Sequence, residues 1–275
     1  MTQAVTTLTG ADYGYAARAK APVPHCPVCG ASNPSLPAMA RWSIQVGVSV
    51  CDCGLAYLNP CMTASEYAEF YAHWYRPLVE AYLPPSARAI PRLVGVACYG
   101  DAIGRLIRPS ITPGGALLDV GGSTGAVATE LGKVVQAETV MVIDPNPTEL
   151  AEAAALGCRT RLGTCENQAP SAEQYHGILC ARTIDHVRDP MTALRWMRSV
   201  LAPGGWLWID MVDAARIRAL WPLSAWRIDH PLYWSRKSLT RALDQTGWSV
   251  VDVWHATDVS HHLGFLCKGA EREWL

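Results

Sequence analysis

The stretch ALLDVGGSTG, residues 116–125, places a short apolar run directly before a glycine-rich turn and a helical pattern. The apolar run predicts a strand, and Gly121 permits a sharp turn at its end. Small residues there let the backbone approach a ligand, whose polar groups meet the free N–H groups of the following helix. Asp144 ends the next apolar run, where its carboxylate can accept both hydroxyls of a ribose. The stretch therefore predicts a strand–turn–helix unit that binds a ribose-containing ligand.

Strands and helices alternate from this stretch to the C-terminus. Such alternation predicts an α/β fold, with a mostly parallel sheet and helices on both of its faces. The last two strands have only a loop between them, so we expect an antiparallel hairpin at one edge. Strands are expected at 116–120, 139–144, 177–181, 206–211, 249–254 and 263–268, and helices at 124–135, 147–156, 190–201 and 238–245.

Two other interpretations of the glycine-rich turn remain open on its residues alone. A dinucleotide fingerprint would place glycines at positions 121, 123 and 126, but Ser123 and Ala126 stand at two of them. The turn could also be a structural connection that binds nothing.

The first 112 residues have a different organisation. Residues 1–21 are polar and weakly patterned, so we expect a flexible N-terminus. Residues 22–62 are rich in Pro, Gly and Cys and carry too little apolar material for a core of their own, which makes a metal staple plausible. Residues 63–112 predict a helical linker or lid, with helices at 63–83 and 88–108 on either side of two prolines. The α/β domain is expected over residues 113–275.

Four cysteines are grouped within the first 53 residues. Cys26 and Cys29 form a C-x-x-C pair, and Cys51 and Cys53 form a C-x-C pair that 21 residues separate from the first. Four thiolates with this spacing suit one tetrahedral zinc ion. Unligated or redox-active thiols are the alternative. His25 and Cys61 could replace a ligand, but each is more simply a bystander.

The composition excludes several classes of protein. The net charge is -1 and no long run of Lys or Arg is present, which argues against a surface built mainly for nucleic acid. No stretch of about 18 apolar residues occurs, so no membrane span is expected. The N-terminus lacks a basic start followed by an apolar core, so a cytoplasmic location is the default expectation.

Four ordered motifs resemble class I S-adenosylmethionine-dependent methyltransferases over residues 116–268. Asp119-x-Gly121-x-Ser-x-Gly125 resembles their motif I, with Ser in place of the middle glycine. YHGILCARTIDHVRDP (175–190) resembles the fourth strand and the loop after it, and LAPGGWLWI (201–209) resembles the turn into the fifth strand. The stretch from 230 to 250 resembles the segment before the sixth. The resemblance implies a Rossmann-like sheet whose last strand is antiparallel.

The resemblance also implies which residues bind S-adenosyl-L-methionine. Asp119 and the loop glycines Gly121, Gly122 and Gly125 would line the methionine end, and Asp144 would hold the ribose. Thr164 and Cys165 occupy the usual adenine-binding pair. The family often has Asp at the first of these positions, so Thr164 weakens the expected bond to the adenine amine. Arg182 would lie beside the amino-acid end of the cofactor.

The complete cysteine pattern is more specific than either pair. CPVCG (26–30) followed by CDCGLAYLNP (51–60) resembles the zinc-binding N-terminal module of bacterial sugar C-methyltransferases. The segment YAHWYRPL (71–78) resembles the aromatic helix that follows this module. Aromatic packing remains the simpler interpretation for most of those residues.

His186 is the leading candidate for a catalytic base. Its unperturbed pKa lies near neutrality, and its motif would place it over the cofactor. A histidine that orders the loop, or only binds substrate, is the alternative. His230 and Tyr233 precede the sixth strand, a usual wall of the acceptor site, and are candidate substrate contacts. Asp185 and Glu166 are weaker candidates.

Methylation of a small molecule is the predicted function, with a nucleotide-linked sugar, a glycan or a natural-product precursor as candidate acceptors. RNA methylation is an alternative, because some rRNA methyltransferases carry a four-ligand zinc module. The near-neutral charge and the form of the second cysteine pair favour the small molecule. A non-catalytic scaffold that binds a partner through its zinc module is a third alternative, which the presence of Asp119, Asp144 and His186 disfavours.

Overall fold

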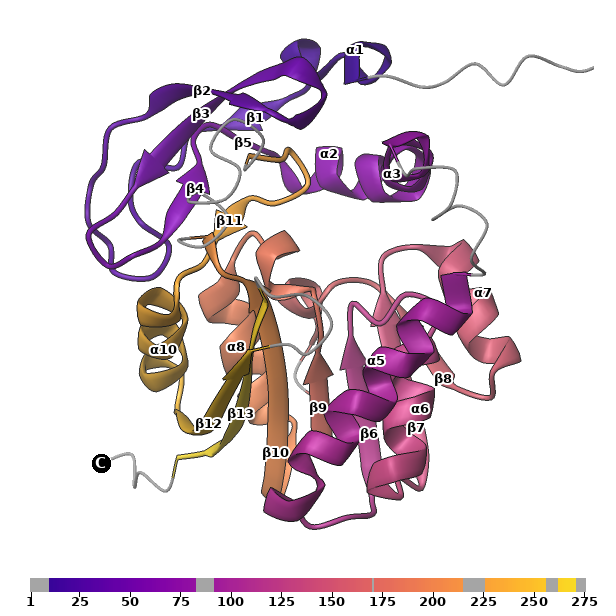
Figure 1. Cartoon of the computed structure of the whole chain (residues 1–275). Coiled ribbons are helices and arrows are strands. Elements are labelled where there is room, and N and C mark those ends of the chain that lie inside the picture. Colours follow the sequence, from indigo (N-terminus) through magenta and orange to yellow (C-terminus); the bar gives the residue numbers. More distant parts are fainter. Residues whose placement is uncertain (1–9, 83–91, 170, 215–225, 256–261, 271–275) are drawn as a thin grey trace, which may run out of the picture.

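A seven-stranded sheet, in the order β12-β13-β10-β9-β6-β7-β8, forms the centre of the computed structural model (Figure 1). The structure describes residues 10–82, 92–169, 171–214, 226–255 and 262–270. Strands β8, β7, β6, β9 and β10 run parallel, whereas β13 pairs antiparallel with both β10 and β12. The bounds are β6 Ala116–Val120, β7 Thr139–Asp144, β8 Arg159–Leu162, β9 Tyr175–Cys180, β10 Leu201–Val212, β12 Trp248–His255 and β13 His262–Gly269. The predicted Rossmann-like fold, with its antiparallel last strand, is confirmed.

Alternate residues of the central strands are buried on opposite faces of the sheet. Leu118 and Ile178 belong to one apolar cluster, and Leu117 and Leu179 belong to another. Burial on both faces explains why these strands read as continuous apolar runs. The flanking helices are α5 Arg92–Ile107, α6 Ala126–Val135, α7 Pro147–Ala155, α8 Pro190–Ser199 and α10 Arg236–Gln245 (Figure 1).

Strand β8 is one element that the sequence analysis missed. Its four residues, RTRL, are mostly exposed at the edge of the sheet and therefore carry no apolar signal. Strand β10 also begins earlier than expected, at Leu201, and contains an irregularity before Trp206.

A second sheet, in the order β11-β4-β3-β2, forms the N-terminal module at the top of Figure 1. Its strands are β2 Leu36–Ala40, β3 Ile44–Val50, β4 Ala56–Leu58 and β11 Leu232–Tyr233, all antiparallel. The fourth strand comes from the C-terminal third of the chain and joins the module to the α/β domain. A short pair, β1 Lys20–Ala21 and β5 Cys61–Met62, lies beside this sheet.

The start of the described chain packs against the module. Residues 1–9 lie outside the described residues, but α1 Gly10–Tyr13 and η1 Tyr15–Ala17 follow directly. Tyr13 is buried, and its ring contacts Phe70 and Trp74 edge-on. Aromatic burial therefore orders the second half of the segment that was expected to be flexible.

The expected helical linker divides into two parts with different positions. The first, α2 Ala64–Glu69, η3 Phe70–Trp74 and α3 Tyr75–Tyr82, begins at Thr63, whose hydroxyl caps the helix by accepting from the Glu66 N–H. The second is α5, whose Tyr99, Ile103 and Ile107 pack on the central sheet. The two prolines at 84 and 85 fall outside the described residues.

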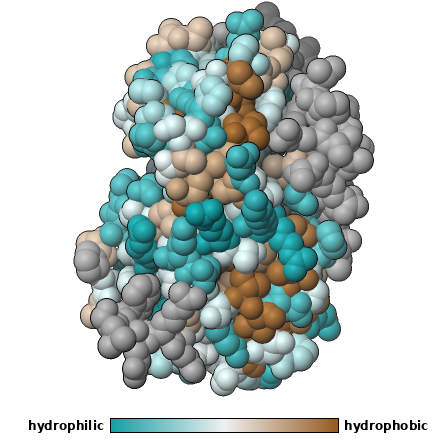
Figure 2. Space-filling model, turned by 90° about the vertical axis from the view of Figure 1, so that its left-hand side faces the viewer, coloured by the Kyte–Doolittle hydropathy of each residue, from teal (hydrophilic) through white to brown (hydrophobic). Residues whose placement is uncertain are grey.

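The described surface is largely hydrophilic on the face shown in Figure 2, with an apolar patch in the half that holds the seven-stranded sheet. No helix in the described part of the chain is long and apolar enough to span a membrane.

Candidate functional site

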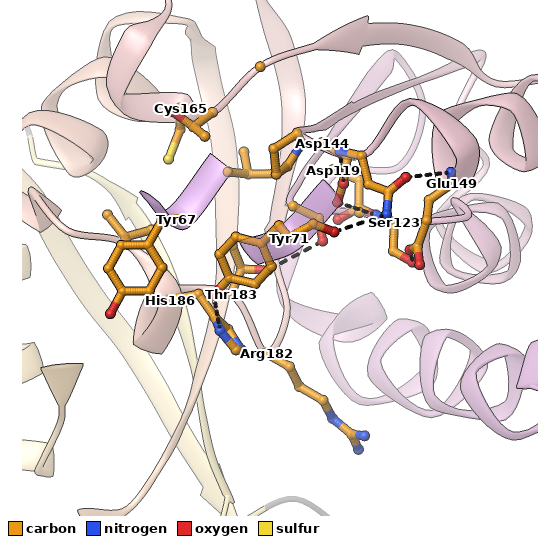
Figure 3. A pocket seen from close by; sticks show the side chains of 18 of the residues that line it. Tyr67, Tyr71, Asp119, Ser123, Asp144, Glu149, Cys165, Arg182, Thr183 and His186 are labelled. Atoms are coloured by element: carbon orange, nitrogen blue, oxygen red, sulfur yellow. Dashed lines mark hydrogen bonds between the residues drawn. The ribbon is translucent and has the colours of Figure 1, made fainter. Parts of the chain in front are cut away.

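A cavity of about 650 Å³ lies at the carboxyl ends of β6, β7 and β9, beneath the segment from Ala64 to Arg76. Ligands of open α/β sheets bind at this edge, where the strand order reverses. The floor comes from the loops after these strands, and the roof comes from α2, η3 and α3 (Figure 3).

The glycine-rich turn forms one wall of the cavity, and its glycines are needed for two reasons. Gly121 and Gly125 adopt left-handed backbone conformations, with φ of 68° and 70°. A Cβ atom at Gly122 would lie 2.4 Å from Asp119 Oδ2, and one at Gly121 would lie 2.5 Å from Thr183 Cγ2. The turn therefore brings bare backbone to the cavity.

Asp119 presents an unsatisfied carboxylate oxygen at this wall. Its side chain is buried, and Oδ2 has no hydrogen-bond partner within the described part of the chain. Burial, and secondarily the nearby carboxylates of Asp144 and Asp210, raise the pKa of Asp119 to about 8. A buried polar atom without a partner is costly, so the site fits a ligand that donates hydrogen bonds or carries positive charge.

Asp144 holds the turn and faces the same cavity. Its two carboxylate oxygens accept the N–H groups of Ser123 at 2.9 Å and Asn146 at 2.8 Å. Burial raises the pKa of Asp144 to about 6, although those two N–H groups act in the opposite direction. Each oxygen keeps a second lone pair, so two hydroxyls of a ribose could still donate to it.

The predicted adenine pair and Arg182 also line the cavity. Thr164 Oγ1 is buried and lacks a partner among the described residues, and Cys165 is buried beside it. The guanidinium of Arg182 lies over the Tyr99 ring at 4.3 Å from its centroid. Figure 3 shows the Arg182 side chain leading away from the carboxylates of Asp119 and Asp144.

His186 borders the cavity with one ring nitrogen fixed. Its Nδ1 lies 2.8 Å from the Asp229 carbonyl oxygen and 2.7 Å from the Tyr71 hydroxyl. The carbonyl oxygen can only accept, so Nδ1 carries the proton and donates to it, which leaves Nε2 as the acceptor nitrogen. Burial lowers the pKa of His186, so the ring is neutral near pH 7.

Behind His186 lies a buried ion pair between Arg227 and Asp229. The guanidinium binds both carboxylate oxygens, at 3.0 Å from Nε and 2.5 Å from Nη2. The ligand atoms of His186, Asp229 and His230 lie within 4.8 Å of one another, as in a metal site. The guanidinium already occupies the carboxylate that a cation would need, so we assign this cluster to positioning and not to metal binding.

The two predicted substrate residues are placed differently. The His230 ring meets the His186 ring edge-on, 4.5 Å between centroids, whereas the Tyr233 hydroxyl donates to the Arg227 carbonyl at 2.8 Å. Neither residue is among those that line the cavity. The structure therefore gathers His186 and His230, and gives Tyr233 a role in holding the turn between 227 and 233.

Three residues of the site were not singled out from the sequence. Tyr71 binds His186, and Arg76 of α3 binds Glu149 of α7 through two hydrogen bonds of 2.5 and 3.0 Å. Arg76 also donates to Ser123 in the glycine-rich turn, at 3.2 Å. The signal for Tyr71 and Arg76 was the aromatic segment at 71–78, for which packing was the simpler interpretation, and Glu149 had no such signal. Sequence distance hid these contacts, which join segments more than forty residues apart.

The four cysteines converge in the N-terminal module. Cys26 Sγ lies 3.6 Å from Cys53 Sγ, Cys29 Sγ lies 3.3 Å from Cys51 Sγ, and all four sulfurs lie within 4.8 Å of one another. Sulfurs about 3.8 Å apart are expected around tetrahedral zinc with bonds of about 2.3 Å. The donor set and its geometry therefore fit zinc, while Cys61 lies apart, against the Tyr67 hydroxyl.

Known proteins match this chain in both sequence and fold. The sequence profile of a methyltransferase domain family matches residues 95–253. A ubiquinone biosynthesis O-methyltransferase of Vibrio vulnificus (strain YJ016) is 29% identical over 105 residues, which is 36% of this chain and 45% of the relative. The match thus spans less than half the length of that curated relative.

Solved structures share the fold at low sequence identity. The DhpI–SAH complex superposes with a TM-score of 0.56 at 24% identity, over 76% of this chain and 100% of that one. An S-adenosylmethionine-dependent methyltransferase from Clostridium acetobutylicum ATCC 824 gives 0.51 at 11% identity, over 74% of this chain and 99% of that one. The profile match covers more than half of the chain and shows that the chain belongs to the methyltransferase domain family, and the solved structures show that it shares their fold.

Proposed function

We propose that the chain methylates a small-molecule acceptor, with His186 as the base that takes the acceptor's proton. The observation that carries this proposal is the contact of His186 Nδ1 with the Asp229 carbonyl oxygen at 2.8 Å, from which we infer the tautomer of the ring. Its Nδ1 proton is then committed to the Asp229 carbonyl, no hydrogen bond joins Nε2 to a described residue, and the His186 residue borders the cavity. A neutral acceptor nitrogen in that place can receive a proton from a bound nucleophile.

The cofactor half of the cavity would be formed by Asp119, Gly121, Gly122, Gly125, Asp144, Thr164 and Cys165, with Arg182 at its border. S-adenosylmethionine supplies a methyl group on a positively charged sulfur, already activated for displacement. The unsatisfied Oδ2 of Asp119 would accept from the amino-acid end, and Asp144 would accept from the ribose. Thr164 Oγ1 would bind at the adenine edge.

A small acceptor fits the cavity of about 650 Å³. The roof residues Tyr67, Tyr71 and Tyr75 close over the cavity, and the near-neutral chain offers no basic tract for phosphates. The Vibrio relative, a ubiquinone biosynthesis O-methyltransferase, also favours a small molecule. The cysteine pattern favours a nucleotide-linked sugar, a glycan or a natural-product precursor among small molecules. RNA methylation and a non-catalytic scaffold are the outcomes that would replace this proposal.

An acceptor screen tests the proposal. The purified chain is incubated with S-adenosylmethionine labelled in the methyl group and with pools of nucleotide sugars, glycans, phenols and total RNA. Mass spectrometry should find one added methyl group in a small-molecule pool and none in RNA. Label in RNA alone would favour the alternative enzyme. Cofactor binding without transfer to any pool would favour the scaffold.

We further propose that Cys26, Cys29, Cys51 and Cys53 hold one structural zinc ion. The convergence of their four sulfurs supports the assignment. Elemental analysis should find one zinc per chain, and Cys51→Ser should lose metal and stability together, because metal binding and folding of a small module are linked. Cys98→Ser changes an exposed cysteine elsewhere and is the matched control. Full zinc occupancy in Cys51→Ser would refute the assignment.

A further inference from the structure

The loop from Trp226 to Tyr233, named the acceptor loop below, is held at both ends by the N-terminal module. At one end, the Trp226 carbonyl accepts from the Arg41 N–H at 2.7 Å. At the other, the Pro231 carbonyl accepts from the Leu58 N–H at 2.9 Å, and Leu232 and Tyr233 form β11 against β4. A two-residue strand has little stability of its own, so the loop's position depends on the strand it joins.

The cysteine cluster in turn fixes that strand. Cys53 stands three residues before β4, and the Cys51 N–H donates to the Leu55 carbonyl at 2.9 Å. The Cys51–Cys53 knuckle also touches the C-terminal part of the chain directly, because Lys237 Nζ donates to the Asp52 carbonyl at 2.8 Å. One set of thiols therefore sets the start of β4, and β4 sets the acceptor loop.

The acceptor loop ends this chain of contacts at the catalytic histidine. The Asp229 carbonyl receives the His186 Nδ1–H at 2.8 Å and the Tyr71 hydroxyl at 3.0 Å. The neighbouring Ile228 carbonyl receives the Tyr67 hydroxyl at 2.8 Å. These backbone atoms orient His186 and tie the acceptor loop to the roof.

The cofactor wall has a separate support within the central sheet. The Gly121 N–H donates to the Ile143 carbonyl at 2.7 Å, and the Ser123 N–H donates to Asp144 at 2.9 Å. All of these residues belong to β7 or to the turn between β6 and α6. Within the described part of the chain, the four cysteines make no hydrogen bond to these segments. The cofactor wall thus has hydrogen bonds of its own, although the module's cysteines share an apolar cluster with Val120 and Ile143.

We infer that the four-cysteine module is the scaffold of the acceptor half of the site, so that its metal sets the position of Asp229 and His186 without being needed for cofactor binding. This inference rests on the proposed zinc ion and on the proposed role of His186. It gives the module a part in acceptor geometry, in addition to its own folding.

Hydrogen exchange of the full-length protein, followed by mass spectrometry, tests the inference. Three samples are compared: the zinc-loaded chain, the same chain after zinc chelation, and the chelated chain after zinc is returned. Metal removal should accelerate exchange of peptides over 226–235 by about tenfold or more, since it frees β4 and with it β11. Peptides over 116–126 should keep their rates. Calorimetry with S-adenosylhomocysteine should show a dissociation constant within about threefold of the loaded protein. Returning zinc should restore protection of the acceptor loop.

Cys29→Ser and Cys98→Ser provide matched variants. Cys29→Ser should reproduce the chelated state, whereas Cys98→Ser should resemble the wild type in zinc content and exchange. Chelation of the wild type keeps the test open if Cys29→Ser fails to fold. Faster exchange confined to residues 22–58 would overturn the inference, because the position of the acceptor loop would then not depend on the metal. Loss of protection at 116–126 together with loss of S-adenosylhomocysteine binding would also overturn it, since the effect would be global. Elemental analysis tests the zinc proposal separately. A purified chain without metal would contradict both the zinc proposal and this inference.

Discussion

Burial raises the pKa of Asp119 to about 8, so we expect its carboxyl to be protonated near pH 7 and to release that proton when a cationic cofactor binds. A cationic amino group beside Oδ2 would stabilise the carboxylate and lower that pKa, so binding should release a proton. Affinity for S-adenosylhomocysteine should therefore increase as the pH rises from about 6 to about 8. Calorimetry in buffers of different ionisation enthalpy measures the released proton. Asp119→Asn keeps the shape but cannot ionise and should release none; equal release from both proteins would contradict the assignment.

The pKa of His186 is shifted in the opposite direction to that of Asp119. Burial lowers its pKa, so the neutral base persists to more acidic pH than an ordinary imidazole, and the methylation rate should fall only as the pH drops below that lowered value. His186→Ala should lower kcat by a factor on the order of 10² to 10⁴, with little change in cofactor affinity. Steady-state kinetics with the acceptor found by screening measures this.

His73→Ala is the matched control for that experiment, because His73 is exposed on η3. It should retain the wild-type kcat. If saturating acceptor restored most of the rate of His186→Ala, the residue would be a substrate ligand and not the base.

At the scale of elements, the pair of Arg76 and Glu149 fastens the roof helix α3 to α7 across the cofactor cavity. Arg76→Ala should remove this link and that to Ser123, and so accelerate dissociation of S-adenosylhomocysteine by about tenfold, since one lost charge-assisted contact of about 1.4 kcal/mol has that effect. Stopped-flow tryptophan fluorescence measures the rate. Arg76→Lys keeps the charge without the forked geometry, so its dissociation rate should fall between those of the wild type and Arg76→Ala. An unchanged rate in Arg76→Ala would show that the roof is held elsewhere.

The elements differ in how much of them the sequence could predict. The central strands were predictable, because β6, β7 and β9 are buried on both faces and therefore consist of continuous apolar residues. Edge strand β8 was not, because RTRL is exposed and has no such pattern. The glycines of the cofactor turn made it predictable. Strand β11 was not predictable, because it has two residues and a partner far away in the sequence, so it shows no local periodicity.

The candidate site shows the same contrast. Asp119, Asp144 and the cysteines belong to short local motifs, so their spacing identified them. The contact between Tyr71 and His186 joins residues 115 positions apart, and no local pattern records it. Tyr233 was proposed as a substrate contact because it precedes the sixth strand in the sequence. Its hydroxyl instead donates to the Arg227 carbonyl, a contact that only the folded turn shows.

On the scale of the whole molecule, the module and the α/β domain share a core as well as a sheet. Ile228 and Tyr233 belong to the apolar cluster of the module, together with Ala56, Leu58 and Phe70. A fragment that begins at residue 92 would expose these side chains and the free edge of β11. We expect it to self-associate and to bind S-adenosylhomocysteine more weakly than the full chain, measured by light scattering and calorimetry. A monomeric fragment with full affinity would show that the α/β domain is independent.

The pairing of β4 with β11 also constrains the order in which the chain can fold. During synthesis, β2, β3 and β4 emerge early, but the partner that covers β4 does not exist until Leu232 has been made. An uncovered strand edge is a template for wrong pairing, and contacts between residues so far apart in sequence form slowly. The nascent module must therefore wait with one edge open, and closure of that edge is expected to be a late step of folding. When cells produce this protein quickly or at high temperature, aggregation is expected to occur at that step, before the edge of β4 is covered.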